Sequence, residues 1–162
     1  MHGVNDPMIE QAIQAYVKLM RASRSVVSRV EPLVGAQGLT LTQLGVLEGI
    51  LHKGPMTHRE LGRKVLTSAG NMTDVVDKLE GRGLVRRVRA AADRRQVRVE
   101  LTEAGQELIE ALFPRHAEDI ARAMAELDPA ELGQLGGLLR KLGIAAARMT
   151  EETNLAGVEG ET

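Results

Sequence analysis

The chain has 162 residues, with 21 Lys and Arg residues against 22 Asp and Glu residues, and a net charge of −1. It has no Cys, no Trp, one Tyr and one Phe, and 43% of its residues are apolar. This length is typical of one domain with a substantial core. The lack of Cys excludes disulfide scaffolds, cysteine nucleophiles, thiol switches and Cys-ligated metal sites, and so few aromatic residues exclude base-stacking platforms.

The N-terminal region predicts one long helix over residues 7–34, because apolar residues recur close to helical spacing. These residues are Ile9, Ile13, Tyr16, Val17, Met20, Val27 and Val30. Asp6 and Glu10 stand where a signal peptide carries basic residues, and no run reaches the ~18 apolar residues of a membrane span. We therefore expect a cytoplasmic protein with no membrane partner.

Three short helices are predicted between residues 40 and 81. Capping pairs, whose side chains satisfy free backbone donors at a helix start, begin them at Thr40–Gln43, Thr57–Glu60 and Thr67–Ser68. The third helix has apolar residues at the spacing i, i+3, i+4 and i+7, namely Met72, Val75, Val76 and Leu79. Short helices joined by tight turns predict a helix-turn-helix.

The apolar period changes from helical to alternating after Gly83. Val97, Val99 and Leu101 alternate with polar residues, which predicts a half-buried strand. An earlier strand begins near Leu84, and a polar, charged tip joins the two. A basic hairpin directly after a helix-turn-helix is a winged-helix arrangement.

The rest of the chain predicts a helix over residues 103–126 and a last helix beginning at the capping box Asp128–Glu131. The last helix carries Leu132, Leu135, Leu138, Leu139 and Leu142. Residues 150–162 are acidic and predict a loose tail. The expected fold class is mainly α with a small β-hairpin wing, a winged helix-turn-helix with long N- and C-terminal helices.

The net charge hides an uneven distribution of charge along the chain. Residues 57–100 hold 11 basic and 6 acidic residues, whereas residues 101–162 hold 5 basic and 12 acidic residues. Most basic residues of the first block are Arg, whose planar donor fork suits phosphate and guanine edges. The alternative for any one of them is a solvated surface charge, and their clustering favours a polyanion partner.

The outward side of the third short helix is the expected reading surface for DNA. If the apolar residues face the core, the opposite side carries Ser68, Gly70, Asn71, Asp74 and Lys78. Ser and Asn can donate and accept hydrogen bonds at base edges in the major groove. Thr67 and Ser68 can also bind phosphate at the helix start, and the alternative is that they are only caps.

The expected hairpin tip combines one acidic and two basic side chains, Asp93, Arg94 and Arg95. An Arg at the tip of a wing can enter a narrow minor groove, where the potential is most negative. Asp93 would then hold Arg95 through a charge-assisted hydrogen bond. The alternative is a turn-forming Asp beside solvated arginines.

Two motifs in this region are the most specific in the chain: Leu79-Glu-x-x-Gly-Leu-Val85, and Asp93-x-Arg95 leading to Leu101-Thr-Glu-Ala-Gly105. They resemble those of the multiple-antibiotic-resistance regulator (MarR) family, and the resemblance covers roughly residues 8–148. It implies a homodimeric winged-helix regulator of a bacterial gene. Such a regulator binds pseudo-palindromic double-stranded DNA, often in its own promoter region, and releases it when a small phenolic ligand or an oxidant is sensed.

The resemblance also implies a domain organisation within one intertwined unit: an N-terminal dimerisation helix (1–36), a DNA-binding lobe (37–102), C-terminal dimerisation helices (103–149) and an acidic tail (150–162). Apolar seams on the terminal helices favour a homodimer, because a monomer of this size would struggle to cover both. The expected interface residues are Ile9, Ile13, Leu132, Leu135, Leu139 and Leu142. We expect a ligand-responsive repressor of its own or adjacent genes, although operator position decides between repression and activation.

Departures from the family pattern narrow the signals that the chain can sense. Without Cys, the thiol-sensing branch is excluded, and the scattered His residues lack the spacing of a metal site. We expect no metal and no cofactor. In the family, effectors bind between the dimerisation helices and the winged-helix lobe, where the candidate lining residues are Tyr16, Met20, Leu47, Leu51, Phe113 and His116. The alternative for such an apolar stripe is hydrophobic core, and the existence of an effector stays open.

Two other functional classes compete with a DNA-binding regulator. A winged-helix protein–protein interaction module without DNA binding is the alternative function, and the Arg-rich wing argues against it. The sequence has no nucleophile–base pair, phosphate-cradling Gly loop, metal spacing or carboxylate pair that points to an enzyme. We therefore expect no enzymatic activity.

Overall fold

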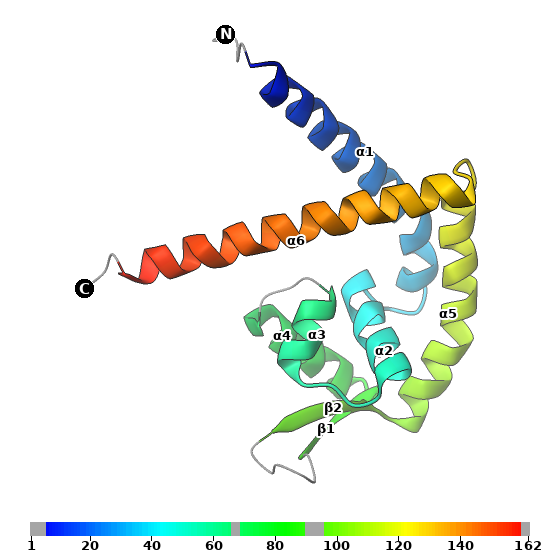
Figure 1. Ribbon diagram of the computed structural model, residues 1–162. Helices are drawn as coiled ribbons and strands as arrows, with labels where there is room; N and C mark the ends of the chain where they lie inside the picture. Colours follow the sequence, from blue (N-terminus) through cyan, green and yellow to red (C-terminus); the bar gives the residue numbers. More distant parts are fainter. Residues whose placement is uncertain (1–5, 66–68, 90–95, 160–162) are drawn as a thin grey trace. The chain divides into compact units, whose positions relative to one another are not determined.

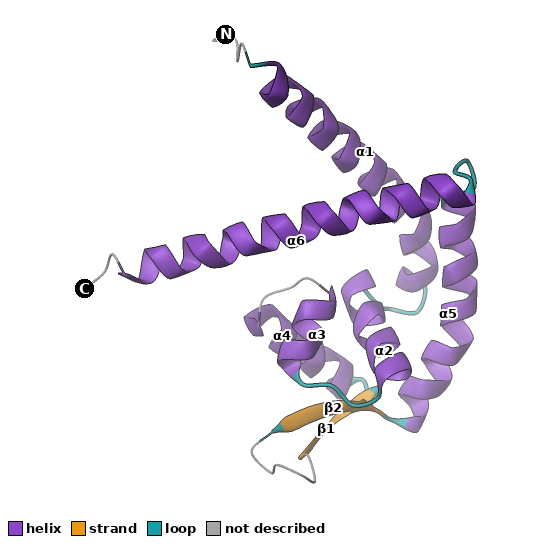
Figure 2. Cartoon of the chain, in the orientation of Figure 1, coloured by secondary structure: helices purple, strands orange, loops and turns teal. Residues whose placement is uncertain are grey.

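The computed structural model describes residues 6–65, 69–89 and 96–159. The chain contains helices and one antiparallel hairpin (Figures 1 and 2), in the order α1 (Pro7–Gly35), α2 (Leu41–Lys53), α3 (His58–Val65), α4 (Ala69–Gly81), β1 (Val85–Arg89), β2 (Val97–Leu101), α5 (Glu103–Ala123) and α6 (Pro129–Glu159). This confirms the predicted fold class, a winged helix-turn-helix with long terminal helices. The chain forms two compact units, Met1–Ala123 and Met124–Thr162.

The predicted capping boxes begin α2 and α3. The backbone N–H of Gln43 donates to the Thr40 hydroxyl at 3.2 Å, and the Gln43 side chain accepts from the Thr40 backbone N–H at 2.9 Å. Thr57 and Glu60 exchange the same pair of bonds at 3.3 and 2.7 Å. These local bonds satisfy donors that have no partner within the helix, so the starts of both helices lie where the sequence predicts them.

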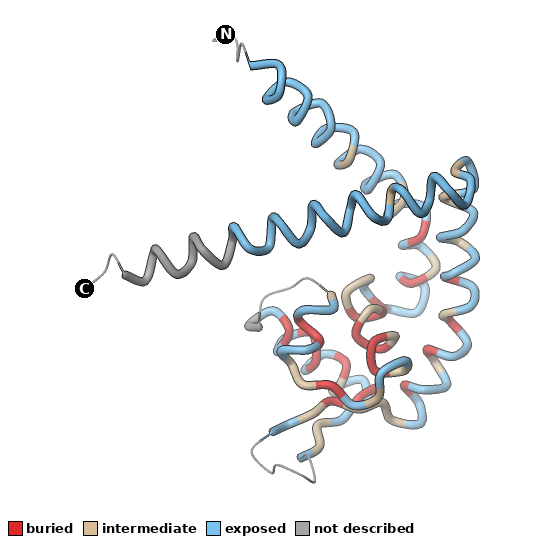
Figure 3. The backbone as a smooth tube through the Cα atoms, viewed as in Figure 1, coloured by how far each residue is buried: buried red, intermediate tan, exposed pale blue. Residues whose placement is uncertain are grey.

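The core of the first unit lies between α2, α3, α4, α5 and the base of the hairpin (Figure 3). The predicted inward residues of α4 are all buried, with Met72, Val76 and Leu79 fully so. They pack in one cluster with Leu47 of α2 and Ile109 of α5. Burial of this apolar face holds the three short helices together, since most helical stability in proteins comes from such packing.

The hairpin is anchored at its base. β1 and β2 pair from Val85 with Leu101 to Arg89 with Val97. Val99 exchanges backbone hydrogen bonds with Met56, at 3.0 and 2.7 Å, which ties β2 to the segment between α2 and α3. The buried base therefore leaves the far end of the hairpin as the part that projects.

Two helices end elsewhere than predicted. α5 ends at Ala123, before the predicted residue 126, where the N–H of Leu127 bonds to the carbonyl of Met124 in a turn. α6 continues to Glu159, so most of the predicted loose tail is helical. No proline interrupts that acidic run, and Glu151, Glu152, Leu155 and Ala156 favour helix. α1 has the predicted bounds to within one residue, and its apolar stripe is mostly exposed, with only Val30 and Val34 buried.

The second unit contains α6, whose start was also predicted. One carboxylate oxygen of Asp128 accepts from the backbone N–H groups of Ala130 and Glu131, each at 2.8 Å. The Glu131 side chain accepts in return from the Asp128 backbone N–H at 2.9 Å. Most of the described side chains of α6 are exposed (Figure 3).

Candidate nucleic-acid interface

The outer side of α4 carries the described part of the predicted reading surface. Asn71, Asp74 and Lys78 are exposed, opposite the buried residues of the same helix. Thr73 is exposed as well and was not predicted. Gly70 lies in the first turn of α4, whereas Thr67 and Ser68 lie outside the described residues. The structure thus separates a core side from a polar side on this helix.

The predicted wing tip, Asp93 to Arg95, lies outside the described residues. The strands that lead to it are described, and the residues at their far ends, Arg89 and Val97, are exposed. The roles assigned to the three tip residues stay predictions. In the sequence they stand between β1 and β2, which pair with each other.

Several cations of the basic block are held by neighbouring groups. Arg82 donates to the carbonyls of Gly38 and Gln37 at 2.7 and 2.9 Å. Arg86 forms an ion pair of 2.5 Å with Glu100, its cross-strand partner in the hairpin. Further contacts join Arg98 to the Pro55 carbonyl at 3.3 Å and Lys64 to Glu48 at 3.8 Å. These side chains stabilise the fold through contacts within the protein. A count of charges along the sequence does not show these contacts.

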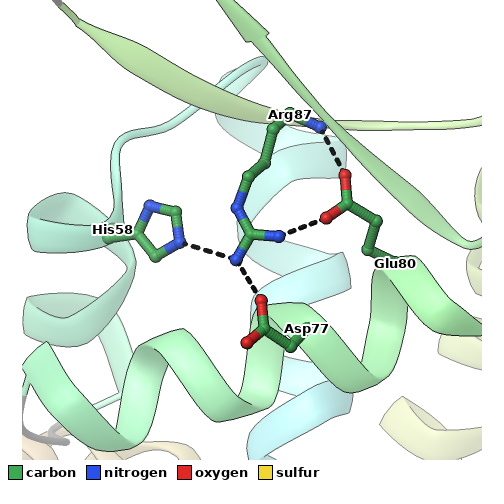
Figure 4. A network of polar contacts seen from close by, with 4 residues as sticks. All are labelled: His58, Asp77, Glu80 and Arg87. Atoms are coloured by element: carbon green, nitrogen blue, oxygen red, sulfur yellow. Dashed lines mark hydrogen bonds and ion pairs between the residues drawn. The ribbon is translucent and has the colours of Figure 1, made fainter.

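A polar cluster joins the wing to α3 and α4 (Figure 4). The Arg87 guanidinium of β1 is paired with Asp77 and Glu80 of α4, at 2.5 Å for the Asp77 oxygen. The Arg87 backbone N–H also donates to Glu80 at 3.1 Å. His58, at the start of α3, places its Nε2 3.4 Å from the guanidinium. The i, i+3 spacing of Asp77 and Glu80 puts both carboxylates on one side of α4 and was the only sequence signal for this cluster.

The pKa values of His58 and Glu60, both near the interface, are shifted from their ordinary values. Burial, and then the positive charge of Arg87, lower the pKa of His58 from its ordinary value of 6.5, although Asp77 and Glu80 oppose this. The Thr57 backbone N–H and hydroxyl stabilise the charged form of Glu60 and lower the pKa of that carboxyl. At neutral pH, His58 is therefore neutral beside Arg87.

Four cations remain exposed and make no side-chain hydrogen bond or ion pair with other described residues: Arg59 and Arg63 of α3, Lys78 of α4, and Arg89 of β1. Only Lys78 was singled out from the sequence as a DNA contact. Exposed cations on the helix-turn-helix and the wing are suited to bind phosphate. They extend the candidate interface beyond the predicted residues.

The six candidate pocket residues lie in different surroundings. Tyr16 and Met20 line an open hollow along α1 together with other α1 side chains. Leu47 is fully buried in the core, and Leu51 and Phe113 pack against that core. His116 is 8% exposed, and its Nδ1 has no hydrogen-bond partner among the described residues. The pocket stays a prediction. For Leu47 the alternative holds, because its side chain is part of the hydrophobic core.

No group of metal-ligating side chains is found within 6–65, 69–89 and 96–159. In the same parts of the chain, no helix has the length and apolar character needed to cross a membrane.

Similarity to known proteins decides the family. The MarR family model matches residues 39–97, from the start of α2 into the hairpin. The HTH-type transcriptional regulator YkoM of Bacillus subtilis is 36% identical over 140 residues, which cover 86% of this chain and 91% of YkoM. This chain belongs to the MarR family.

Two further similarities describe this MarR-family chain more closely. The transcriptional repressor NicR of Pseudomonas putida is 32% identical over 104 residues, covering 64% of this chain and 66% of NicR. The solved structure of BpsR from Bordetella bronchiseptica, whose DNA binding is regulated by 6-hydroxynicotinic acid, has a TM-score of 0.70 at 29% identity and covers 77% of this chain and 89% of BpsR. At the general level that these relatives share, the chain is a DNA-binding regulator of transcription.

Proposed function

We propose that this chain acts as a homodimer that binds a pseudo-palindromic operator sequence-specifically and represses its own or adjacent genes. The observation that carries the proposal is the polar outer side of α4. Asn71, Asp74 and Lys78 are exposed there, directly opposite the buried face that packs the helix onto the lobe. A helix held in this way presents side chains to the edges of bases in the major groove.

Individual roles follow from the chemistry of the side chains. Asn71 reads adenine or another base edge, and Asp74 accepts from a cytosine amino group or orients a neighbouring Arg. Lys78 contacts phosphate, as do Thr67 and Ser68 at the helix start, while Gly70 allows close approach to the backbone of DNA.

The wing supplies the second contact. Arg95 enters the minor groove beside the site that α4 reads, with Asp93 holding its guanidinium and Arg94 adding a second cation. The exposed ends of both strands support this placement of the tip at the projecting end of the hairpin.

The dimer is proposed from the exposed apolar side chains of the terminal helices. In the single chain, Ile13 of α1 is 51% exposed and Leu142 of α6 is 52% exposed. Ile9, Leu132 and Leu139 are exposed in the same way, and Leu135 is partly buried. Extended apolar surface on a chain of this size marks an interaction site, and a twofold partner covers it with the same residues.

Repression and ligand response are proposed from the relatives. NicR is a repressor, and the DNA binding of BpsR is regulated by a hydroxylated pyridine carboxylic acid. We propose that a small aromatic acid releases this chain from its operator, with Tyr16, Met20, Phe113 and His116 among the contacting residues. Release of bound duplex by such an acid in a gel-shift titration supports this part of the proposal.

DNA binding is tested with the intergenic duplex upstream of the gene and a scrambled duplex of equal length. We expect the wild-type protein to prefer the intergenic duplex and to protect two half-sites about one helical turn, ~10 bp, apart. Arg95→Ala weakens binding strongly while the protein stays folded, because one minor-groove contact is lost from each wing. Arg140→Ala on α6 is the matched control and leaves binding unchanged.

Two outcomes contradict the proposal in different ways. If Arg95→Ala binds the intergenic duplex as well as the wild type, the assignment of the wing tip is wrong. If the wild-type protein shifts neither duplex at low salt, DNA binding itself is excluded, and the winged-helix protein–protein module becomes the better explanation.

A further inference from the structure

Arg87 connects elements that are expected to read different grooves of DNA. Its guanidinium donates hydrogen bonds to the carboxylates of Asp77 and Glu80 on α4, so both bonds join oppositely charged groups. Glu80 accepts at the same time from the Arg87 backbone N–H at 3.1 Å. One residue of α4 therefore holds both the main chain and the side chain of β1 (Figure 4).

The surroundings of Arg87 exclude it from binding phosphate. Its side chain is only 27% exposed, and two carboxylates meet its single positive charge. With His58 neutral, as its lowered pKa requires at neutral pH, the cluster has a net charge of −1. A phosphate group would be repelled by this cluster, so Arg87 is not one of the cations that attract DNA.

Arg89 provides the contrast on the same strand. It lies two residues beyond Arg87 and on the same face of the hairpin. Arg89 is exposed, and its side chain has no hydrogen bond or ion pair with any other residue that the structure describes. The two arginines therefore lie on the same face of one strand but in opposite surroundings, which makes Arg89 the matched control for Arg87.

The wing needs such an attachment. Each strand has five residues, and an isolated two-stranded hairpin is at best marginally stable in water. The bridge to Met56 holds β2, and the Arg87 cluster holds β1. Because a recognition helix and a wing must meet neighbouring grooves together, a hairpin that is free to tilt would lose the fit to a specific site before it lost attraction to DNA.

We propose that Arg87 is a positioning residue for operator recognition: through Asp77 and Glu80 it holds the wing at a fixed place relative to the recognition helix α4, without contacting DNA. His58 is the fourth residue of the cluster, and its Nε2 lies 3.4 Å from the Arg87 guanidinium. This inference rests on the proposed function, because it concerns how the DNA-binding lobe reads its site.

The experiment measures affinity for the operator duplex and for the scrambled duplex over a series of salt concentrations. Arg87→Met keeps an unbranched stem like that of Arg and removes the charged guanidinium group. We expect it to weaken operator binding by about tenfold or more, the size of one lost base contact, and to leave scrambled-duplex binding and the salt dependence unchanged. Arg87→Lys gives an intermediate loss, since one ammonium group replaces the bidentate fork poorly. Arg89→Ala weakens binding to both duplexes alike. It also lowers by about one the slope of log affinity against log salt concentration.

The double variant Asp77→Asn with Glu80→Gln separates positioning from simple electrostatics. It removes two negative charges from the lobe, so electrostatics alone predicts tighter binding to any DNA. The positioning role predicts weaker operator binding, because the anchor of Arg87 is lost. This variant also decides the matter if Arg87→Met fails to fold, which circular dichroism and thermal unfolding establish beforehand.

Three results overturn the inference. They are operator binding by Arg87→Met equal to that of the wild type, an equal loss on both duplexes with a reduced salt slope, and tighter operator binding by the double variant. If the wild-type protein binds neither duplex, the proposed function itself fails, which is a distinguishable result.

Discussion

Arg82 shows how a single side chain joins segments that are distant in sequence. It follows α4, yet its guanidinium donates to the Gly38 and Gln37 carbonyls in the loop between α1 and α2, at 2.7 and 2.9 Å. Gly38 has a φ of 65°, a left-handed conformation that Gly adopts without strain. Arg82 thus holds a loop whose turn depends on a glycine, and its charge is used within the protein.

His58 predicts a dependence of stability on pH. Burial and the charge of Arg87 lower its pKa in the folded protein below the ordinary 6.5. As pH falls through that value, the unfolded chain binds a proton at this position that the folded chain does not, so the free energy of unfolding decreases. His58→Gln removes this contribution. Urea unfolding at pH 7.5 and 5.5 is expected to show a smaller loss of stability for His58→Gln than for the wild type, and equal losses would contradict the shifted pKa.

At the scale of elements, the contact between α5 and the turn before β1 decides where the hairpin sits. The Thr102 hydroxyl donates to the Gly83 carbonyl at 2.6 Å, and the Thr102 backbone N–H donates to the Leu84 carbonyl at 3.1 Å. Gly105 lies in the first turn of α5 against the same turn, where a Cβ atom would meet the Leu84 carbonyl oxygen at 1.9 Å. Only a glycine allows the helix to approach this closely.

Gly105→Ala is therefore expected to destabilise the protein by about 3 kcal/mol, since backbone and not a flexible side chain must move. Gly137→Ala on α6 is the control, because nothing lies within 4 Å of its Cβ position. There the helix propensity of Ala gives a gain of up to about 1 kcal/mol. Urea unfolding followed by circular dichroism measures both changes in stability. A Gly105→Ala protein as stable as the wild type would rule out the close approach of α5 to the Leu84 carbonyl.

Element starts were predicted more accurately than element ends. Thr40, Thr57 and Asp128 cap α2, α3 and α6 through bonds within three residues, so the local sequence contains the whole signal. The ends of α5 and α6 have no comparable signal. An apolar stripe continued past Ala123 although the chain turns there, and acidic residues after position 149 indicated a tail although the helix continues.

At the scale of the whole molecule, the exposed apolar residues of the terminal helices predict a dimer. We expect light scattering at micromolar concentration to give about twice the chain mass of 17.5 kDa. Leu139→Asp places a charge in the expected seam and shifts the protein toward monomer, because an unpaired charge would be buried in the interface. Lys141→Asp, outside the expected seam on the same helix, leaves the dimer intact. A monomeric wild-type protein would also remove the argument for a twofold operator.

The distribution of charge along the chain is also a property of the whole molecule. The block 57–100 has an excess of five basic residues and the block 101–162 an excess of seven acidic residues. The excess of basic residues overstates the attraction of this block for DNA, because Arg82, Arg86 and Arg87 are engaged within the lobe. The exposed cations that remain, on α3, α4 and β1, belong to the elements proposed to meet DNA.

The sequence by itself determined the order of the helices, the buried face of α4 and the pairing of two strands into a hairpin. These features depend on short-range patterns, such as helical spacing, alternation and capping, which are complete within a few residues. Only the tertiary structure decided what each charged side chain does. Arg87 and Arg89 are the same residue on one face of one strand, yet the first meets two carboxylates of α4 and the second meets solvent. That difference arises from packing between elements, because a partner ten residues away in sequence becomes a contact only once the chain has folded.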